Sequence, residues 1–404
     1  MYNSTRFARG AKPKFSHKFS GKRSFSNSGP RRAFGNREKI DISRFIKQAS
    51  QAGATAPAIK ISRTFRDFKF SALLLENIEK LGFSTPTPVQ DQSMQAILDG
   101  QDIVGLANTG SGKTGAYLLP IIENILKDKR RKALVMAPTR ELAIQINEDF
   151  RKFSRGMRLD SAIVVGGMPQ GKQIMDLRRN PNIIIGTPGR LKDFESRRLI
   201  NFSQFAVVVL DEVDRMLDMG FIDDIKILMG RTSAQRQTLF FSATMPIKTK
   251  TLANQFLKSP FSVEIQSNQS ADNVEQSVIH TAGSSDKLET LKKLLSNPEM
   301  KKVLIFSETK HGVEQLYKSL KNEGFKIESI HGNKRQNQRQ KALSLFREDR
   351  INVLVATDVA ARGLDIKNIT HVINYTVPHT YDDYIHRIGR TGRANAKGVA
   401  FTFA

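Results

Sequence analysis

The sequence contains no cysteine and no tryptophan among its 404 residues. Without cysteine, disulfide bonds and thiolate metal ligands are excluded, and a reducing compartment is allowed. No apolar run approaches the ~18 residues needed to cross a bilayer, and the first forty residues hold no apolar segment typical of a secretory signal. We therefore expect a cytoplasmic protein that does not bind membranes.

Acidic residues are also scarce, with 39 Asp and Glu against 64 Lys and Arg, for a formal net charge of +25. So large an excess indicates a polyanionic partner, either nucleic acid or an anionic membrane surface. Because no membrane segment is present, the composition favours nucleic acid.

The basic excess is greatest in residues 1–39, where Lys and Arg are mixed with Ser, Gly and recurring Phe. This composition predicts a disordered tail, suited to loose binding of single strands by charge and base stacking. A solubilising tail is the alternative. A transit peptide is disfavoured because several Gly and Pro would break its helix. Residues 40–64 are expected to form an extension and a linker.

From residue 65 onward, short apolar segments alternate with amphipathic ones, beginning with a predicted helix over Phe70–Leu81 and a second helix running towards Leu98. This alternation predicts an α/β fold of mainly parallel sheets with helices on both faces. We expect a first domain at 65–265, a linker at 266–275 where the apolar pattern lapses, and a second domain at 276–404. The predicted strands are Ile103–Leu106, Ala133–Ala137, Ala162–Val165, Ile183–Ile185, Phe205–Leu210, Thr238–Phe241, Val303–Phe306, Ile327–Ile330, Val353–Ala356, His371–Ile373 and Val399–Phe403.

A phosphate-binding loop is predicted directly after the first of these strands. The loop consists of Ala107, Asn108, Thr109, Gly110, Ser111 and Gly112, and a helical pattern opens at Lys113 and Thr114. Backbone N–H groups of such a loop and the start of the helix favour an anion. Lys113 would reach the outer phosphates and the Thr114 hydroxyl would hold Mg²⁺. Ala107 stands where the common pattern has Gly.

Two carboxylates follow the apolar strand that ends at Leu210. Asp211 and Glu212 would lie at the edge of the sheet where open α/β folds bind ligands. We expect Asp211 to hold Mg²⁺, partly through water, and Glu212 to polarise the water that attacks the terminal phosphate. A solvated acidic turn is the alternative, but it does not explain the apolar strand or the upstream loop.

Taken together, these segments resemble the DEAD-box RNA helicases of helicase superfamily 2, with Asp211-Glu212-Val213-Asp214 at the motif that names the family. The resemblance covers residues 65–403 and implies two tandem RecA-like domains, with ATP and Mg²⁺ as cofactors. It implies that Phe65, Phe83 and Gln90 recognise adenine, although Gln90 could instead cap a helix. Asp365 is similar to the ribose contact, and Arg390 and Arg393 are similar to arginine fingers.

The same resemblance implies that Asp214, Ser242, Thr244 and His386 couple the nucleotide state to RNA binding. It also implies contacts to RNA phosphates and riboses, although each of these motifs alone could be a turn. The implied contact residues are Pro138, Thr139, Arg140, Gly166, Gly167, Thr187, Pro188, Gly189, Arg190, Gln336, Arg339, Thr357, Arg362 and Gly363.

The resemblance implies a monomeric enzyme in which ATP and RNA close the two domains together, because both bind the closed form better. RNA-stimulated ATP hydrolysis would then drive local unwinding of short RNA duplexes and remodelling of RNA–protein complexes, with little sequence preference. Two alternatives stay open at this point: an ATP-dependent RNA clamp with little turnover, and a related enzyme that acts on DNA.

Overall fold

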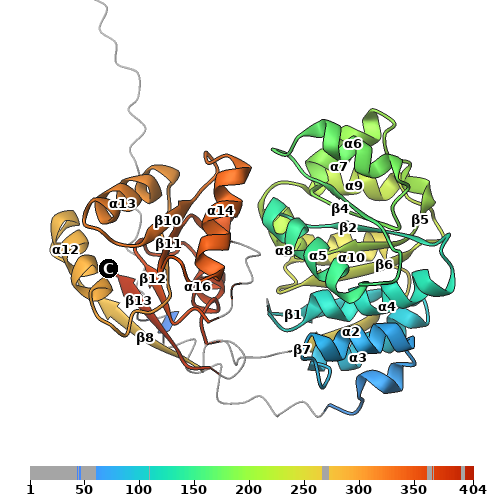
Figure 1. The fold of residues 1–404 in the computed structure, drawn as a ribbon, viewed down its shortest axis with the longest axis horizontal. Coiled ribbons are helices and arrows are strands. Elements are labelled where there is room, and N and C mark those ends of the chain that lie inside the picture. Colours follow the sequence, from blue (N-terminus) through green and yellow to red (C-terminus); the bar gives the residue numbers. More distant parts are fainter. Residues whose placement is uncertain are drawn as a thin grey trace, which may run out of the picture. The chain divides into compact units, whose positions relative to one another are not determined.

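The computed structural model describes residues 43, 45–46, 61–108, 110–265, 273–361, 366, 368–392 and 396–404. Two sheets account for all its strands, and each sheet is parallel throughout (Figure 1). This arrangement confirms the α/β fold class predicted from the sequence. The basic tail at 1–39 lies outside the described residues.

The first sheet has seven strands in the order β3-β4-β2-β5-β6-β1-β7. Its strands are β1 (Ile103–Ala107), β2 (Lys132–Met136), β3 (Ser161–Val164), β4 (Ile183–Gly186), β5 (Phe205–Leu210), β6 (Gln237–Ser242) and β7 (Phe261–Ile265). The helical segments around it are η2 (Phe65–Phe68), α2 (Ala72–Lys80), α3 (Pro88–Leu98), α4 (Lys113–Lys127), α5 (Arg140–Phe153), α6 (Gln170–Arg178), α7 (Pro188–Ser196), η3 (Phe202–Gln204), α8 (Val213–Asp218), α9 (Ile222–Arg231) and α10 (Ile247–Phe256).

Both faces of this sheet are buried. Along β5, Val207 and Val209 join the core cluster under α3, α4 and α5, whereas Val208 and Leu210 join the cluster under α7, α8 and α9. Side chains alternate between the two faces of a strand, so a strand covered on both faces is apolar throughout. This explains why the sequence predicted β5 so clearly.

The second sheet has six strands in the order β10-β11-β9-β12-β13-β8. Its strands are β8 (Val274–Ile279), β9 (Val303–Phe306), β10 (Ile327–Ile330), β11 (Val353–Ala356), β12 (His371–Asn374) and β13 (Gly398–Phe403). Its helices are α12 (Ser284–Leu295), α13 (Lys310–Asn322), α14 (Gln336–Arg347), α15 (Asp358–Ala361) and α16 (Tyr381–Ile388).

The predicted linker needs a correction at its downstream end. We placed it at 266–275, directly after β7 ends at Ile265, but β8 already begins at Val274. Both are edge strands: in β7 only Val263 and Ile265 are buried. An edge strand covers little of the core, so its sequence lacks the apolar run that marks a central strand. The other domain limits stay predictions.

A short piece of the extension at 40–64 packs on the second domain. Ser43, Phe45 and Ile46 are helical. The Phe45 ring lies 5.7 Å from that of Tyr381 and 5.9 Å from that of Tyr384, both on α16. From the sequence we expected only an extension and a linker at 40–64. Within the described ranges, every helix is too short or too polar to span a lipid bilayer.

Candidate nucleotide and RNA site

The predicted phosphate loop connects β1 to α4. Gly112 caps α4 with a φ of +95°, and a Cβ there would lie 2.7 Å from Thr87 Oγ1 and 2.9 Å from Gln90 Nε2. Only glycine fits this backbone and this space. Lys113, at the start of α4, is buried, and its Nζ donates to the Ala107 carbonyl at 2.7 Å. The positive end of α4 and the Lys113 ammonium therefore meet where the sequence predicted a phosphate site. Thr109 lies outside the described residues.

Gln90 caps a helix, as the alternative from the sequence allowed. Its Oε1 accepts from the Thr87 backbone N–H at 2.9 Å, and its Nε2 donates to the Gly112 carbonyl at 3.0 Å. Gln90 therefore ties the start of α3 to the phosphate loop. A contact between this side chain and adenine stays a prediction.

The two aromatic residues predicted at the adenine differ in their surroundings. Phe65 is buried within η2. Phe83 remains 42% exposed, and its ring lies 6.0 Å from that of Phe153. The structure thus places Phe65 in the core and Phe83 at the surface, and stacking of either ring on a base stays a prediction.

The acidic motif begins where β5 ends. Asp211 is buried, and its Oδ2 accepts from the Tyr117 hydroxyl at 2.9 Å, while its Oδ1 has no hydrogen-bond partner. Burial raises the pKa of Asp211 to about 6, although the Lys113 charge opposes that shift and Glu212 adds to it. A carboxylate oxygen buried without a donor is costly, and such an oxygen is a suitable ligand for a cation.

The residues that follow are held tightly. Glu212 has a φ of +52°, an uncommon backbone conformation for a non-glycine residue, and it caps α8. Such strain persists where the surrounding structure enforces it and is frequent at functional sites. Val213 is fully buried in the core beneath α8, which gives its branched side chain a packing role.

The donor set at this point suits Mg²⁺, which binds few protein oxygens and fills its shell with water and substrate phosphates. Asp211 supplies one carboxylate, and Thr114 stands beside Lys113 at the start of α4. The described residues contain no cluster of three or more His, Asp or Glu side chains that could hold a metal ion by themselves. The residues present therefore fit an ion that comes with the nucleotide.

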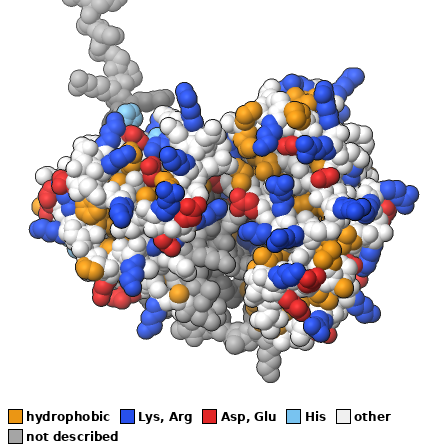
Figure 2. All heavy atoms as spheres, in the orientation of Figure 1, with side chains coloured by type: hydrophobic (Ala, Val, Ile, Leu, Met, Phe, Trp, Pro, Cys, Tyr) orange, Lys and Arg blue, Asp and Glu red, His pale blue; other side chains and the backbone are white. Residues whose placement is uncertain are grey.

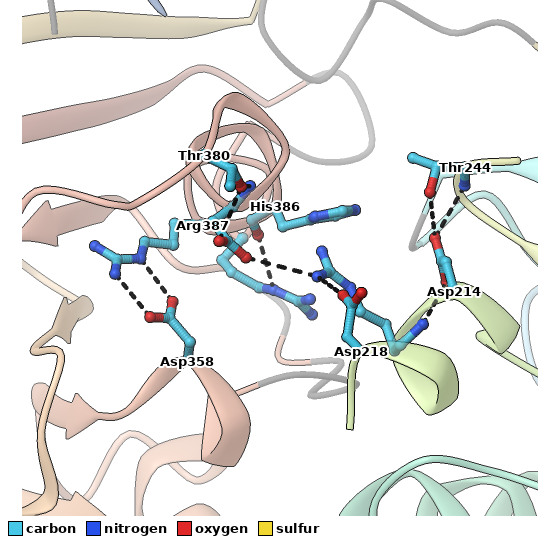
Figure 3. A network of polar contacts seen from close by, with 10 residues as sticks. Asp214, Asp218, Thr244, Asp358, Thr380, His386 and Arg387 are labelled. Carbon is cyan, nitrogen blue, oxygen red and sulfur yellow. Dashed lines mark hydrogen bonds and ion pairs between the residues drawn. The ribbon is translucent and has the colours of Figure 1, made fainter. Parts of the chain in front are cut away.

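The three predicted coupling residues of the first domain form one hydrogen-bonded group, and Figure 3 shows the contacts between Asp214 and Thr244. Asp214 Oδ2 accepts from the Thr244 backbone N–H at 2.9 Å and from its hydroxyl at 3.0 Å. The Asp214 backbone N–H donates to Ser242 Oγ at 3.3 Å, and that hydroxyl donates to the Thr244 carbonyl at 2.7 Å. The loop after β6 is thereby fixed to the acidic motif after β5.

In the second domain, the buried guanidinium of Arg387 forms a bidentate pair with Asp358, at 2.6 and 2.7 Å (Figure 3). Arg390 is also buried, and its Nε donates to the His386 carbonyl at 3.3 Å. The buried Nδ1 of His386 has no hydrogen-bond partner. Arg393 and Asp365 lie outside the described residues, so their roles stay predictions.

Two arginines at this network were missed by the sequence reasoning. Arg387 lies inside the predicted arginine-rich motif and is buried near the C-terminal end of α16. Arg215 directly follows the acidic motif, and its Nη1 lies 3.3 Å from Asp218 and 3.6 Å from Asp383. Their positions beside recognised motifs were the available signal, but Asp358 and Asp383 are remote from these arginines in sequence.

The predicted RNA-contact residues of the first domain gather where strands end and helices begin. Thr139 caps α5 and accepts from the Leu142 N–H at 3.2 Å. The Arg140 guanidinium lies against Gly166 and Gly167, where a Cβ at Gly167 would come within 2.2 Å of Arg140 Nη1. Pro138 precedes this cap, and Thr187, Pro188, Gly189 and Arg190 form the equivalent start of α7 after β4.

Arg190 is held in place by its own helix. Its Nη1 pairs with Asp193 at 3.0 Å, its guanidinium lies 4.9 Å from the centre of the Phe194 ring, and its buried Nε has no partner. Many other Lys and Arg side chains are scattered over both domains on the face in view in Figure 2.

The predicted RNA residues Gln336 and Arg339 both contact Glu141, the residue after Arg140. Gln336 Nε2 donates to Glu141 Oε1 at 2.9 Å, and Arg339 Nη2 lies 2.8 Å from Oε2. Burial lowers the pKa of Arg339, against the charge of Glu141. Thr357 lies between β11 and α15, directly before the helix begins at Asp358. Arg362 and Gly363 lie outside the described residues. RNA contact by this whole group stays a prediction.

Comparisons with known proteins agree on one protein family. The DEAD/DEAH box helicase family matches residues 87–252, and the helicase conserved C-terminal domain matches residues 286–395. Over 377 residues, the chain is 44% identical to DEAD-box ATP-dependent RNA helicase 30 of Arabidopsis thaliana. That match covers 91% of this chain and 63% of the relative, so the chain spans less than two thirds of the relative's length.

Two solved structures are similar over most of the chain. Dbp5 of S. cerevisiae, bound to RNA and ADP BeF3, is 30% identical with a TM-score of 0.76, covering 85% of this chain and 90% of that one. Mss116p, bound to ssRNA and AMP-PNP, is 32% identical with a TM-score of 0.77, covering 86% and 76%. The fold and site define a protein with two RecA-like domains. The chain belongs to the DEAD-box RNA helicase family.

Proposed function

We propose that this chain is an ATP-dependent RNA helicase, in which RNA stimulates ATP hydrolysis and hydrolysis drives local remodelling of RNA duplexes and RNA–protein complexes. The observation that carries the proposal is the buried Asp211 carboxylate, which has one oxygen without a partner, close enough to the Lys113 ammonium for that charge to lower its pKa. The groups that a nucleoside triphosphate and its metal need are therefore collected at one sheet edge.

The residues of the site have distinct roles in this proposal. The phosphate loop and Lys113 bind and orient the phosphates, and Glu212 holds a proton of the attacking water. Bound Mg²⁺ supplies charge that stabilises the phosphate oxygens as negative charge builds up. The Asp214, Ser242 and Thr244 group transmits the state of this site to the loop after β6. Arg390 supplies positive charge from the second domain.

The test is steady-state ATP hydrolysis by the full chain, with and without single-stranded RNA. We expect RNA to raise the rate, and Glu212→Gln to lower the RNA-stimulated rate about 10²–10⁴-fold, the usual contribution of a general base. Glu76→Gln, at an exposed side chain of α2, is the matched control and should behave like the wild type. If Glu212→Gln leaves turnover unchanged while ATP and RNA still bind, the chain is an RNA clamp instead.

The finer points of the proposal rest on the same resemblance. RNA would be bound with little sequence preference through phosphates and 2′-hydroxyls, which competition by single-stranded DNA would test. Val213 in place of the usual Ala would leave the activity intact because the side chain is buried in the core. A monomeric state and a cytoplasmic location stay predictions.

A further inference from the structure

Tyr117 has no role in the function described so far, yet it contacts the centre of the nucleotide site. It lies on α4 and is fully buried. Its hydroxyl donates to Asp211 Oδ2 at 2.9 Å, across 94 residues of sequence. Its ring lies 5.5 Å from that of Phe241 on β6. The ring contact and the burial fix the position of the side chain, so the hydroxyl is presented to Asp211 from a rigid support.

This contact makes the two oxygens of Asp211 unequal. Oδ2 is occupied by the Tyr117 hydroxyl, whereas Oδ1 is buried without any partner. A phenol donates only one proton, so Tyr117 can hold one carboxylate oxygen and leave the other open to a cation.

Tyr117 also shares a helix face with the second residue predicted at the metal. Residues three apart on a helix lie on one face, so Thr114 and Tyr117 of α4 point the same way. The Tyr117 hydroxyl therefore meets Asp211 on the face of α4 that also carries Thr114.

We propose that Tyr117 is a positioning residue that sets the orientation of Asp211 so that Asp211 Oδ1 faces the magnesium ion of the nucleotide. The inference rests on the proposed function for the identity of the ligand. Partners that orient the residues around a metal change its affinity by about 10–100-fold when they are removed. Tyr117 should therefore act on the metal and leave binding of the metal-free nucleotide unaffected.

The experiment is a Mg²⁺ titration of the binding of a fluorescent ADP analogue to the full chain. We expect Tyr117→Phe, which keeps the ring and removes the hydroxyl, to raise the half-maximal Mg²⁺ concentration by about 10-fold. Affinity for the analogue in EDTA should stay at the wild-type value. Tyr384→Phe is the matched control, because it removes another buried tyrosine hydroxyl, which donates to Gln276 at 2.7 Å in the second domain, and it should leave the Mg²⁺ titration unchanged.

The inference is overturned if Tyr117→Phe has the same half-maximal Mg²⁺ concentration as the wild type. It is also overturned if the variant loses affinity for the ADP analogue equally with and without Mg²⁺, because Tyr117 would then support only the phosphate loop. A second measurement combines Tyr117→Phe with Asp211→Asn. If Tyr117 acts through Asp211, the double variant should match Asp211→Asn alone, and additive effects would contradict the proposal. Failure of the proposed function is distinguished from failure of this inference, because in that case the wild-type protein itself would not hydrolyse ATP faster with RNA.

Discussion

Replacing Asp211 by Asn should make the nucleotide-free protein more stable at neutral pH. Asp211 is buried with its Oδ1 unpaired, and burial raises its pKa to about 6. Asn has nearly the same shape, keeps an oxygen for the Tyr117 hydroxyl and carries no charge. The variant therefore removes the cost of burying the charge without opening a cavity.

The raised pKa of Asp211 gives the size and the pH dependence of the expected change in stability. The folded chain holds the Asp211 proton more tightly than the unfolded chain, so stability is lost as pH rises from about 4 to about 6. The difference between about 6 and the ordinary 3.8 corresponds to about 3 kcal/mol at neutral pH. For a domain of this size, that is a shift of about 6–12 °C in the unfolding temperature.

The assay is differential scanning calorimetry of the full chain without nucleotide, at pH 7.5 and pH 4, following the transition of the first domain separately from that of the second. Asp211→Asn should raise the first transition at pH 7.5 and have little effect at pH 4. Asp218→Asn, whose side chain is 56% exposed, serves as the control and should change neither. The reasoning fails if Asp211→Asn destabilises the first domain at pH 7.5, or if any gain is equal at the two pH values.

Two further predictions concern backbone and packing. Gly167→Ala, at a φ of +75° and with its Cβ within 2.2 Å of Arg140 Nη1, should cost the first domain about 1–3 kcal/mol and weaken RNA binding in fluorescence anisotropy; Gly171→Ala, which meets nothing within 4 Å, is the control, and equal behaviour of the two variants would contradict the steric argument. Phe45→Ala should lower the stability of the second domain by about 1 kcal/mol, the value of an aromatic contact, because it removes the Phe45 ring that packs on Tyr381 and Tyr384 of α16. If calorimetry finds the unfolding temperature of the second domain unchanged, this contact does not stabilise the domain.

The central strands could be predicted because strands buried on both faces consist of consecutive apolar residues. β9, β10 and β11 begin and end at the predicted residues, whereas the edge strands β7 and β8 were not predicted, and β8 begins inside the predicted linker. At an edge only part of each strand meets the core, so polar residues are tolerated and the apolar signal fades.

The candidate site shows the same division. The phosphate loop and the acidic motif were recognisable because each is a run of adjacent residues whose spacing suits one ligand. Gln90 was singled out as an adenine contact, which stays a prediction, and only the folded chain shows that its amide joins α3 to Gly112. Arg387 was missed because nothing in the sequence shows that Asp358 receives its guanidinium.

The sequence by itself therefore determined the two-domain α/β organisation, the strand-end motifs and the basic charge, because each depends on neighbouring residues or on composition. Tertiary structure alone decided the contacts between distant residues, such as Tyr117 with Asp211 and Glu141 with Gln336, which are 94 and 195 residues apart. Hydrogen bonds act over about 3 Å, and only the folded chain brings such groups within that distance.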